Sequence, residues 1–281
     1  MTGFVYNRNE AHIESPVVSV ICLNKNHAQY LEDTIFSVLS QKFEDFEFII
    51  ADGGSTDTSI ALIENYKFIK LLPGSDSSGS EGYFRALSAA RGRYVMMTTS
   101  TDGYLCRNWF RSASSILDGD PKISLVFGAS AIMSNEGQLG QIVFPRLFPF
   151  HQGPSKESWP EIWFRGGFEA SYLPELNYCV RIDVLKALSG PSSVFPELND
   201  ATILHRFHFE FFRNGYLPQY LPALANFGRE HPNQLTHSDL DRNSVEIYNS
   251  AWRKYREAVF SRQCTHFLRD GFGEAYAYFN V

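Results

Sequence analysis

Two aspartates stand at points in this sequence where a carboxylate could bind a ligand. Asp52 follows an apolar run within residues 46–57, which read FEFIIADGGSTD. Asp102 follows a second apolar run, residues 94–97, and precedes Gly103. A carboxylate on a glycine turn at the carboxyl end of a strand lies where open α/β sheets bind ligands. The alternative for Asp52 is that it only caps a strand-to-helix turn.

The elements that must position these aspartates alternate along the first hundred residues. Short, continuous apolar runs predict strands buried on both faces, and amphipathic spacing predicts the helices between them. The expected strands are 17–22, 46–51, 68–72 and 94–97, and the expected helices are 28–41, 58–66 and 81–91. This order is typical of right-handed parallel crossovers. Both aspartates would then lie on the same edge of one sheet.

The second half of the chain predicts a mixture of elements. A helix, a strand and a strand pair with a turn at 135–137 come first, and a short strand and helix follow a segment rich in Gly, Pro and aromatic residues. That segment, 151–175, is expected to be a loop-dominated wall of a cleft. Asn199 and Asp200 are expected to head a helix that ends near residue 214, and a last strand covers 221–227. From residue 239 to the end the chain is expected to be helical.

Composition narrows the class of protein. The chain has 281 residues and a formal net charge of −6, which argues against a nucleic-acid binder that relies on bulk positive charge. Its four cysteines, at positions 22, 106, 179 and 264, form no metal-ligand spacing. No run of 18 apolar residues and no leader pattern is present, so we expect a soluble, cytoplasmic protein. Contact with the inner face of a membrane is the most that this composition allows.

Four segments in the right order resemble inverting glycosyltransferase family 2 of the bacterial type, over about residues 16–236. Residues 16–41 are similar to the family's opening strand and helix, and residues 46–57 to its V-D-D-G-S-T-D segment, with Gly53 in place of the second aspartate. Residues 76–102 fit D-x-G…A-x-G-x-Y…D-D without gaps. Asn199-Asp200 with Arg206 looks like the E-D…L-R helix start, and Arg229-Glu230-His231 looks like R-x-H.

The resemblance implies an α/β protein with the GT-A fold. This fold has a Rossmann-like, mostly parallel sheet with helices on both faces, here followed by C-terminal helices. The implied division is a nucleotide-sugar-binding half at 1–105, an acceptor-binding half at 106–236 and a helical extension at 237–281.

The resemblance also implies a nucleotide pocket. Asp52 and Asp76 would contact the base and ribose, and the chain at Leu23 and Asn24 would complete the pocket. Arg85 lies where the family often has a basic residue near the donor. The alternative for Asp76 is a solvated aspartate in a Ser/Gly turn.

A divalent cation, Mn²⁺ or Mg²⁺, is implied as well. Asp102, next to Thr101, would be the surviving carboxylate of the DXD motif, since the positions before it are Thr99, Ser100 and Thr101. A hard cation on oxygen ligands neutralises a departing diphosphate. His231 would be a further ligand, with a neutral loop histidine as its alternative.

Asp200 is the implied general base, because an acceptor hydroxyl attacks only as its proton leaves. Glu197 is the second choice, and a simple helix cap is the alternative reading of Asp200. Arg229 could pair with the diphosphate or with Asp200. Trp163 and Glu169 could line an acceptor pocket, although core packing explains Trp163 equally well.

Together these residues predict a metal-assisted, inverting transfer of a sugar from a nucleotide-sugar to a hydroxyl of a glycan or lipid-linked acceptor. A UDP-sugar is the expected donor. The alternatives are a sugar nucleotidyltransferase and a non-catalytic nucleotide- or sugar-binding relic of the family. The basic, aromatic run at 252–256 could contact an anionic membrane, although a solvated helix face is the more usual meaning of such a run.

Overall fold

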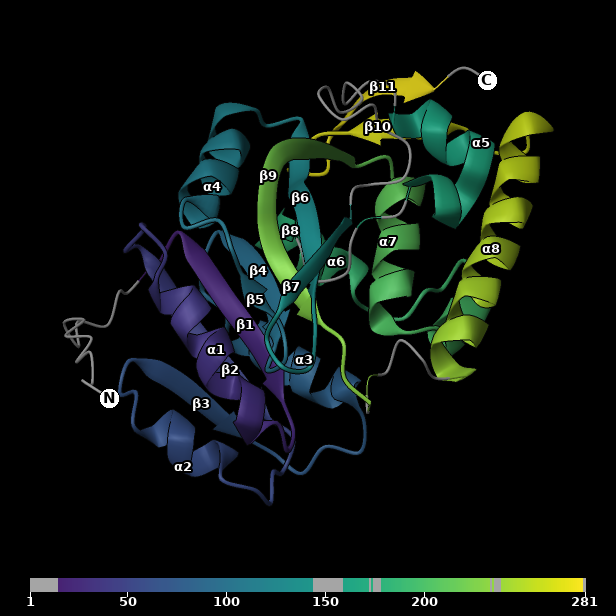
Figure 1. Cartoon of the computed structure of the whole chain (residues 1–281). Coiled ribbons are helices and arrows are strands. Elements are labelled where there is room, and N and C mark those ends of the chain that lie inside the picture. The colour runs from purple at the N-terminus through teal and green to yellow at the C-terminus, as the bar shows by residue number, and fades with distance from the viewer. Residues whose placement is uncertain are drawn as a thin grey trace.

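A large sheet forms the centre of the molecule, with helices packed on both of its faces (Figure 1). The computed structural model describes residues 15–143, 159–171, 173, 178–232, 234 and 239–279. The strand order is β3-β2-β1-β4-β8-β6-β9-β5, and β7 pairs with β6 beside this path. A separate two-stranded sheet, β10-β11, lies near the C-terminus.

The first half of the sheet is parallel, as the alternating pattern predicts. Its strands and helices are β1 (Val18–Asn24), α1 (Ala28–Leu39), β2 (Phe46–Asp52), α2 (Ser59–Glu64), β3 (Ile69–Pro73), α3 (Gly79–Ala89) and β4 (Tyr94–Thr99). β1 lies between β2 and β4, with Asn24 beside Asp52 and Leu23 beside Thr99. The carboxyl ends of three neighbouring strands therefore meet at one edge.

The second half of the sheet is mixed. Its elements are β5 (Gly103–Tyr104), α4 (Trp109–Gly119), β6 (Ile123–Met133), β7 (Leu139–Val143), β8 (Tyr178–Arg181), α6 (Ile182–Leu188) and β9 (Leu217–Arg229). β8 runs antiparallel to both β4 and β6, and β6 runs parallel to β9. The predicted strand pair is present as the β6–β7 hairpin, and the rest of that prediction, 144–150, lies outside the described residues.

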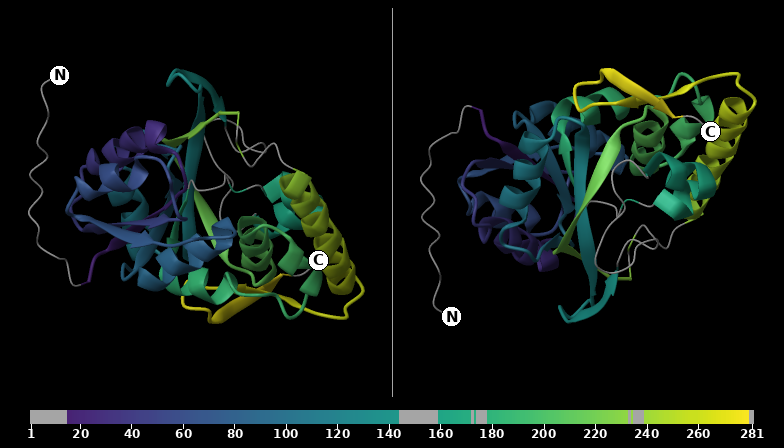
Figure 2. Two further views of the ribbon diagram at one scale, coloured as in Figure 1. Left: turned by 90° about the horizontal axis from the view of Figure 1, so that it is seen from below. Right: turned by 90° about the horizontal axis from the view of Figure 1, so that it is seen from above.

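A layer of helices covers one side of this mixed half (Figure 2). It contains α5 (Trp159–Ser171), α7 (Ile203–Arg213) and α8 (Asp239–Phe260). The prediction of a loop over 151–175 is wrong where α5 forms. The helix is stabilised there because apolar side chains such as Trp163 and Phe164 are buried against α7 and α8. Gly166 and Gly167 lie within α5, where they mark only a kink. Gly167 has φ +58, and a Cβ there would lie 2.8 Å from the Trp252 ring.

The C-terminus is not helical to its end, contrary to the prediction. α8 stops at Phe260, and β10 (His266–Arg269) then pairs antiparallel with β11 (Ala275–Phe279). The turn between them is closed by Asp270, whose Oδ1 accepts hydrogen bonds from the N–H groups of Phe272 and Glu274 at 2.9 and 3.0 Å. Alternating Ala and Tyr in β11 is a strand pattern, which the prediction did not take into account.

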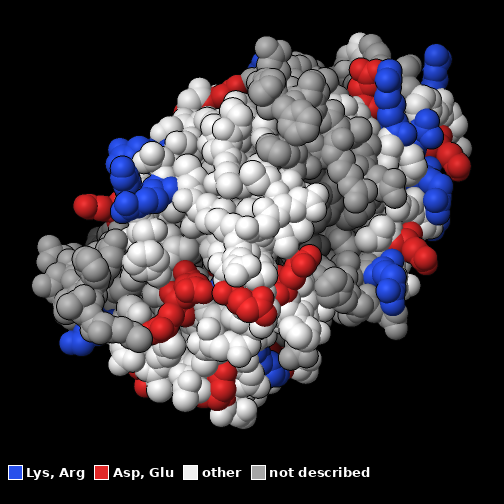
Figure 3. Space-filling view, in the orientation of Figure 1, with Lys and Arg blue, Asp and Glu red and all other residues white. Residues whose placement is uncertain are grey.

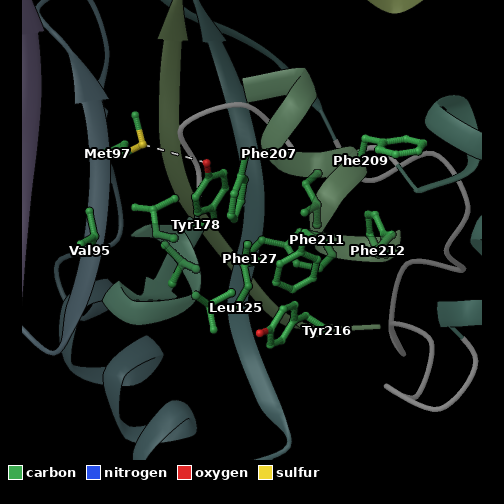
Figure 4. Close-up of a cluster of buried hydrophobic side chains, with 14 of the residues drawn as sticks. Val95, Met97, Leu125, Phe127, Tyr178, Phe207, Phe209, Phe211, Phe212 and Tyr216 are labelled. Atoms are coloured by element: carbon green, nitrogen blue, oxygen red, sulfur yellow. Dashed lines mark hydrogen bonds between the residues drawn. The ribbon is translucent and has the colours of Figure 1, made fainter. Parts of the chain in front are cut away.

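Many of the described aromatic residues of the second half lie in the core. α7 contributes Phe207, Phe209, Phe211 and Phe212, all buried, to a cluster that includes Phe127 and Tyr178 (Figure 4). Burial of each such side chain contributes roughly 1.5–3 kcal/mol. These aromatic side chains are therefore core residues of the mixed half of the fold. Among the described helices, none combines the length and the apolar character needed to cross a membrane.

Candidate functional site

The candidate site lies at the edge where β1, β2 and β4 end. Strand order reverses at β1, since β2 and β3 lie to one side of it and β4 to the other. Ligands bind at such reversal points in open α/β sheets. Backbone bonds tie the three ends together: Gly53 N donates to Asn24 O at 2.8 Å, and Ser100 N donates to Leu23 O at 3.0 Å.

Asp52 organises the turn after β2. Its Oδ1 accepts from the N–H groups of Gly54 and Ser55 at 3.0 and 2.8 Å. Its Oδ2 accepts from Asn24 Nδ2 at 2.7 Å and from Ser55 Oγ at 2.6 Å. A carboxylate offers about four lone-pair sites, and these four bonds use them. The fully buried Asp52 therefore acts through the shape of the turn in this structure.

Asp76 and Arg85 form a bidentate ion pair beside that turn. The two Arg85 amino groups lie 2.5 and 2.8 Å from the two Asp76 carboxylate oxygens, and Nη2 also donates to Asp52 O. This pairing holds the pKa of Asp76 below its usual range. Lys25 Nζ donates to Asp76 O at 2.8 Å. A Cβ at Gly53 would lie only 3.3 Å from Lys25 Cδ, so the glycine leaves room for that lysine.

Asp102, which follows β4, accepts hydrogen bonds from three donors. Thr99 Oγ1 donates to Oδ2 at 2.7 Å, and Oδ1 accepts from Thr101 Oγ1 at 3.3 Å and from Arg229 N at 3.0 Å. Burial raises the pKa of Asp102, while these hydrogen bonds and the nearby His231 oppose that rise. The hydroxyls of Thr99 and Thr101 thus orient this carboxylate.

His231 lies among residues that sequence analysis did not single out. Its ring centroid is 5.3 Å from that of His27, edge to face, and 5.6 Å from that of Tyr30. His27 Nδ1 lies 3.0 Å from Ser100 Oγ, and burial lowers the pKa of His27, as does His231. A polar hollow of about 450 Å³ is lined by these rings and by Lys25, Asn26, Gln29, Asn135 and Pro232. The signal that could have identified His27 is its place in the polar loop directly after β1.

A cation would find an incomplete set of protein ligands here. Among the residues that the structure describes, no group of three or more His, Cys, Asp or Glu side chains is arranged to hold a metal ion. Asp102 and His231 are close enough to interact electrostatically. One carboxylate and one imidazole fit a cation whose other ligands are diphosphate oxygens and water.

Asp200 occupies a different position from the one expected. It is exposed, at the end of a 3₁₀ helix, Pro196–Asp200, and does not head the following α-helix. α7 begins at Ile203 with Thr202 as its N-cap, because Thr202 Oγ1 accepts from His205 N. The start of α7 and the end of β9 lie on the same side of the molecule as the carboxyl ends of β1 and β2 (Figure 1).

Three of the remaining candidates have defined partners. Arg229 pairs with Asp33 at 2.7 Å rather than with Asp200. Glu197 pairs with Lys254 at 2.5 Å. Trp163 is fully buried and donates from Nε1 to Tyr248 Oη at 2.9 Å, which makes it a core residue rather than a platform for a sugar. The side chain of Glu169 lies outside the described residues.

The basic run at 252–256 does not form a uniformly positive surface. Acidic and basic side chains lie beside each other along the edge formed by α8 (Figure 3). Contact with a membrane therefore remains a prediction.

The chain belongs to glycosyl transferase family 2, because the sequence model of that family matches residues 18–180, more than half of the chain. Among curated proteins, TuaG of Bacillus subtilis, assigned to teichuronic acid biosynthesis, is 36% identical over 92 residues, 31% of this chain and 36% of TuaG. The Escherichia coli enzyme WfgD, a UDP-Glc:α-D-GlcNAc-diphosphoundecaprenol β-1,3-glucosyltransferase, is 27% identical over 139 residues, 48% of this chain and 54% of WfgD. These matches span about a third to a half of the relatives' lengths.

Solved structures confirm the GT-A fold. TarS residues 1–349 from S. aureus, in complex with UDP-GlcNAc, align with a TM-score of 0.58 at 16% identity, over 88% of this chain and 74% of that one. The mannosyltransferase PcManGT from Pyrobaculum calidifontis, in complex with GDP-Man and Mn²⁺, aligns with a TM-score of 0.54 at 16% identity, over 88% and 65% of the two chains.

Proposed function

We propose that this protein transfers a sugar, with inversion, from a UDP-sugar to a hydroxyl of a glycan or lipid-linked acceptor. The observation that carries the proposal is the position of Asp102, held by three donors beside His231 at the reversal point of the sheet. Membership of glycosyl transferase family 2 supports the reaction class. The name of WfgD, with a UDP-sugar donor and a lipid-linked acceptor, supports both substrate classes.

The donor would bind across the ends of β1 and β2. Leu23 and Asn24 end β1, and Asp52 shapes the adjoining turn. These residues would form the floor of the nucleotide pocket. Asp76, already fixed by Arg85, would accept hydrogen bonds from ribose hydroxyls, and Arg85 would keep that carboxylate ionised.

Asp102 and His231 would hold Mn²⁺ or Mg²⁺, which when bound neutralises the charge of the departing diphosphate. Thr101 and Thr99 keep the Asp102 carboxylate oriented through their hydroxyls. Asp200 would accept the proton of the acceptor hydroxyl, and its exposure leaves the carboxylate free to meet an incoming acceptor. Attack from the face opposite the diphosphate produces inversion.

A screen of donor hydrolysis and transfer over several nucleotide-sugars, with manganese present, tests the proposal. We expect turnover with a UDP-sugar, loss of turnover in Asp200→Asn, and loss of metal-dependent UDP binding in Asp102→Ala. The small set of protein ligands favours one other candidate, a non-catalytic nucleotide-binding protein. Metal-independent UDP binding, with no hydrolysis of any donor, would support that candidate instead.

A further inference from the structure

Arg229 joins four separate segments at the candidate metal site. Its guanidinium donates from Nη2 to Asp33 Oδ2 on α1 at 2.7 Å, and from Nε to Thr101 O after β4 at 3.3 Å. Nη1 donates to the carbonyl oxygens of Ser134 and Asn135, in the β6–β7 turn, at 3.3 and 3.4 Å. Arg229 itself ends β9. Few side chains could make these bonds, because they need a planar fork with several donors.

The guanidinium is buried and enclosed by rings. The Arg229 side chain is 2% exposed, whereas that of Asp33 is 62% exposed. Its Cζ atom lies 4.9 Å from the centroid of the Tyr30 ring and 5.8 Å from that of Phe227. A buried cation is tolerated only when it is paired and hydrogen-bonded, and cation–π contacts add to this. The position of Arg229 is therefore set by its surroundings.

Arg229 contacts one candidate metal ligand directly and lies two residues from the other. The backbone N–H of Arg229 donates to Asp102 Oδ1 at 3.0 Å, and the carbonyl of the neighbouring Thr101 accepts from its side chain. His231 follows two residues later, with its ring 5.6 Å from the Tyr30 ring that stacks on the guanidinium. The contacts of the guanidinium therefore anchor the end of β9, where the amide bonds Asp102 and the chain continues to His231.

We propose that Arg229 is a positioning residue for the metal–diphosphate site, with Asp33 as its counter-charge, and that it acts without touching the donor. This proposal rests on the proposed function, since it concerns the same site. A direct phosphate ligand would have to expose its guanidinium, which Arg229 does not do. Removing a residue that orients a metal ligand typically lowers the affinity for the metal by about 10–100-fold.

Binding of UDP, measured by calorimetry on the full chain with and without Mn²⁺, tests the proposal. We expect R229M to lower the affinity for UDP with manganese about 10–100-fold and to leave metal-free UDP binding unchanged. R229K keeps the charge but not the fork, so it should resemble R229M. D33N, which alters only an exposed carboxylate, should lower the manganese-dependent affinity about 2–5-fold. E32Q, at the neighbouring exposed acid on α1, is the matched control and should behave as wild type.

Two results would overturn the proposal. One is a manganese-dependent affinity within about twofold of wild type in both R229M and D33N, and D33N decides alone if R229M does not fold. The other is an equal loss of metal-free and manganese-dependent binding, which is what a general structural defect or a direct phosphate contact produces. Wild-type protein that binds UDP with manganese but transfers no sugar contradicts the proposed function alone. Wild-type protein that shows no manganese-dependent binding contradicts both proposals.

Discussion

Asn24 Nδ2 donates a 2.7 Å hydrogen bond to Asp52 Oδ2, and this bond joins the ends of two adjacent parallel strands. The amide nitrogen of Asn24 must face Asp52, since an ionised carboxylate only accepts. The bond is buried, and Asn24 is itself only 3% exposed. The aspartate of the D-G-G-S-T-D turn therefore contributes to folding, in addition to the role proposed for it in nucleotide binding.

Asp52→Ala should destabilise the protein strongly. It removes the acceptor of the partly buried N–H groups of Gly54 and Ser55, and it leaves Asn24 Nδ2 only the 3.2 Å bond to Ser55 Oγ. A buried donor that loses its acceptor costs about 1–3 kcal/mol. We expect the free energy of unfolding, measured in urea, to fall by at least about 3 kcal/mol. Asp52→Asn keeps Oδ1 as an acceptor but sets an amide group against the Asn24 amide. It should therefore lose less stability than Asp52→Ala. Unchanged stability in Asp52→Ala would contradict the saturated geometry.

Asp200→Asn should lower turnover strongly and leave stability almost unchanged. Asp200 is exposed at the end of a 3₁₀ helix, so the stability should change by less than about 0.5 kcal/mol. Loss of the general base should lower kcat about 10²–10⁴-fold, with UDP affinity retained. Steady-state kinetics beside urea unfolding separates these effects. Wild-type kcat in Asp200→Asn would exclude it as the base and return attention to Glu197, which Lys254 already engages.

The Arg85–Asp76 pair predicts a stability difference that depends on pH. Arg85 holds the folded-state pKa of Asp76 below the ordinary 3.8. The pair's contribution is therefore fully present above about pH 5 and is lost as pH falls through 3.8 and the lower folded-state value. Arg85→Met should cost about 1–3 kcal/mol at pH 7, and its difference from wild type should shrink toward pH 2.5. Thermal unfolding across that pH range measures the stability difference between wild type and Arg85→Met. A difference that stays constant with pH would show that Arg85 does not stabilise the protein through Asp76.

The parallel half of the fold could be predicted because its signals are local. Each strand, such as β1 or β2, is a continuous apolar run that ends in a polar turn, and burial on both faces of the sheet requires that pattern. α5 could not be predicted in the same way, because Gly166-Gly167 usually marks a loop. Here the helix is stabilised by packing, with Trp252 Nε1 donating to Trp163 O across the α5–α8 contact.

The candidate site was predictable only where its residues follow strands. Asp52 ends β2 and Asp102 comes three residues after the end of β4, so both could be assigned to one edge of the sheet from the strand order. The contacts of His231 with His27, and of Arg229 with Asp33, join residues far apart in the chain. No spacing rule in a single sequence links such positions. The C-terminal hairpin was missed for a different reason, since the apparent helical continuation outweighed the two-residue period of β11.

A buried histidine in α7 gives the last prediction. His208 is 1% exposed, and neither ring nitrogen has a hydrogen-bond partner among the described residues. Burial lowers the pKa of His208 from 6.5 to about 3, with His205 adding to the effect. Between these values the unfolded chain binds a proton that the folded chain does not, so stability falls as pH decreases through this window.

His208→Leu removes that proton difference while nearly conserving volume. Relative to wild type, the variant should gain about 2 kcal/mol of stability between pH 7.5 and pH 5, since each pH unit below 6.5 is worth up to about 1.4 kcal/mol. Urea unfolding at the two pH values measures the gain. The comparison uses the change with pH, which cancels any packing difference between the two side chains. An equal pH dependence in both proteins would mean that the imidazole in the folded chain accepts a proton as readily as in the unfolded one.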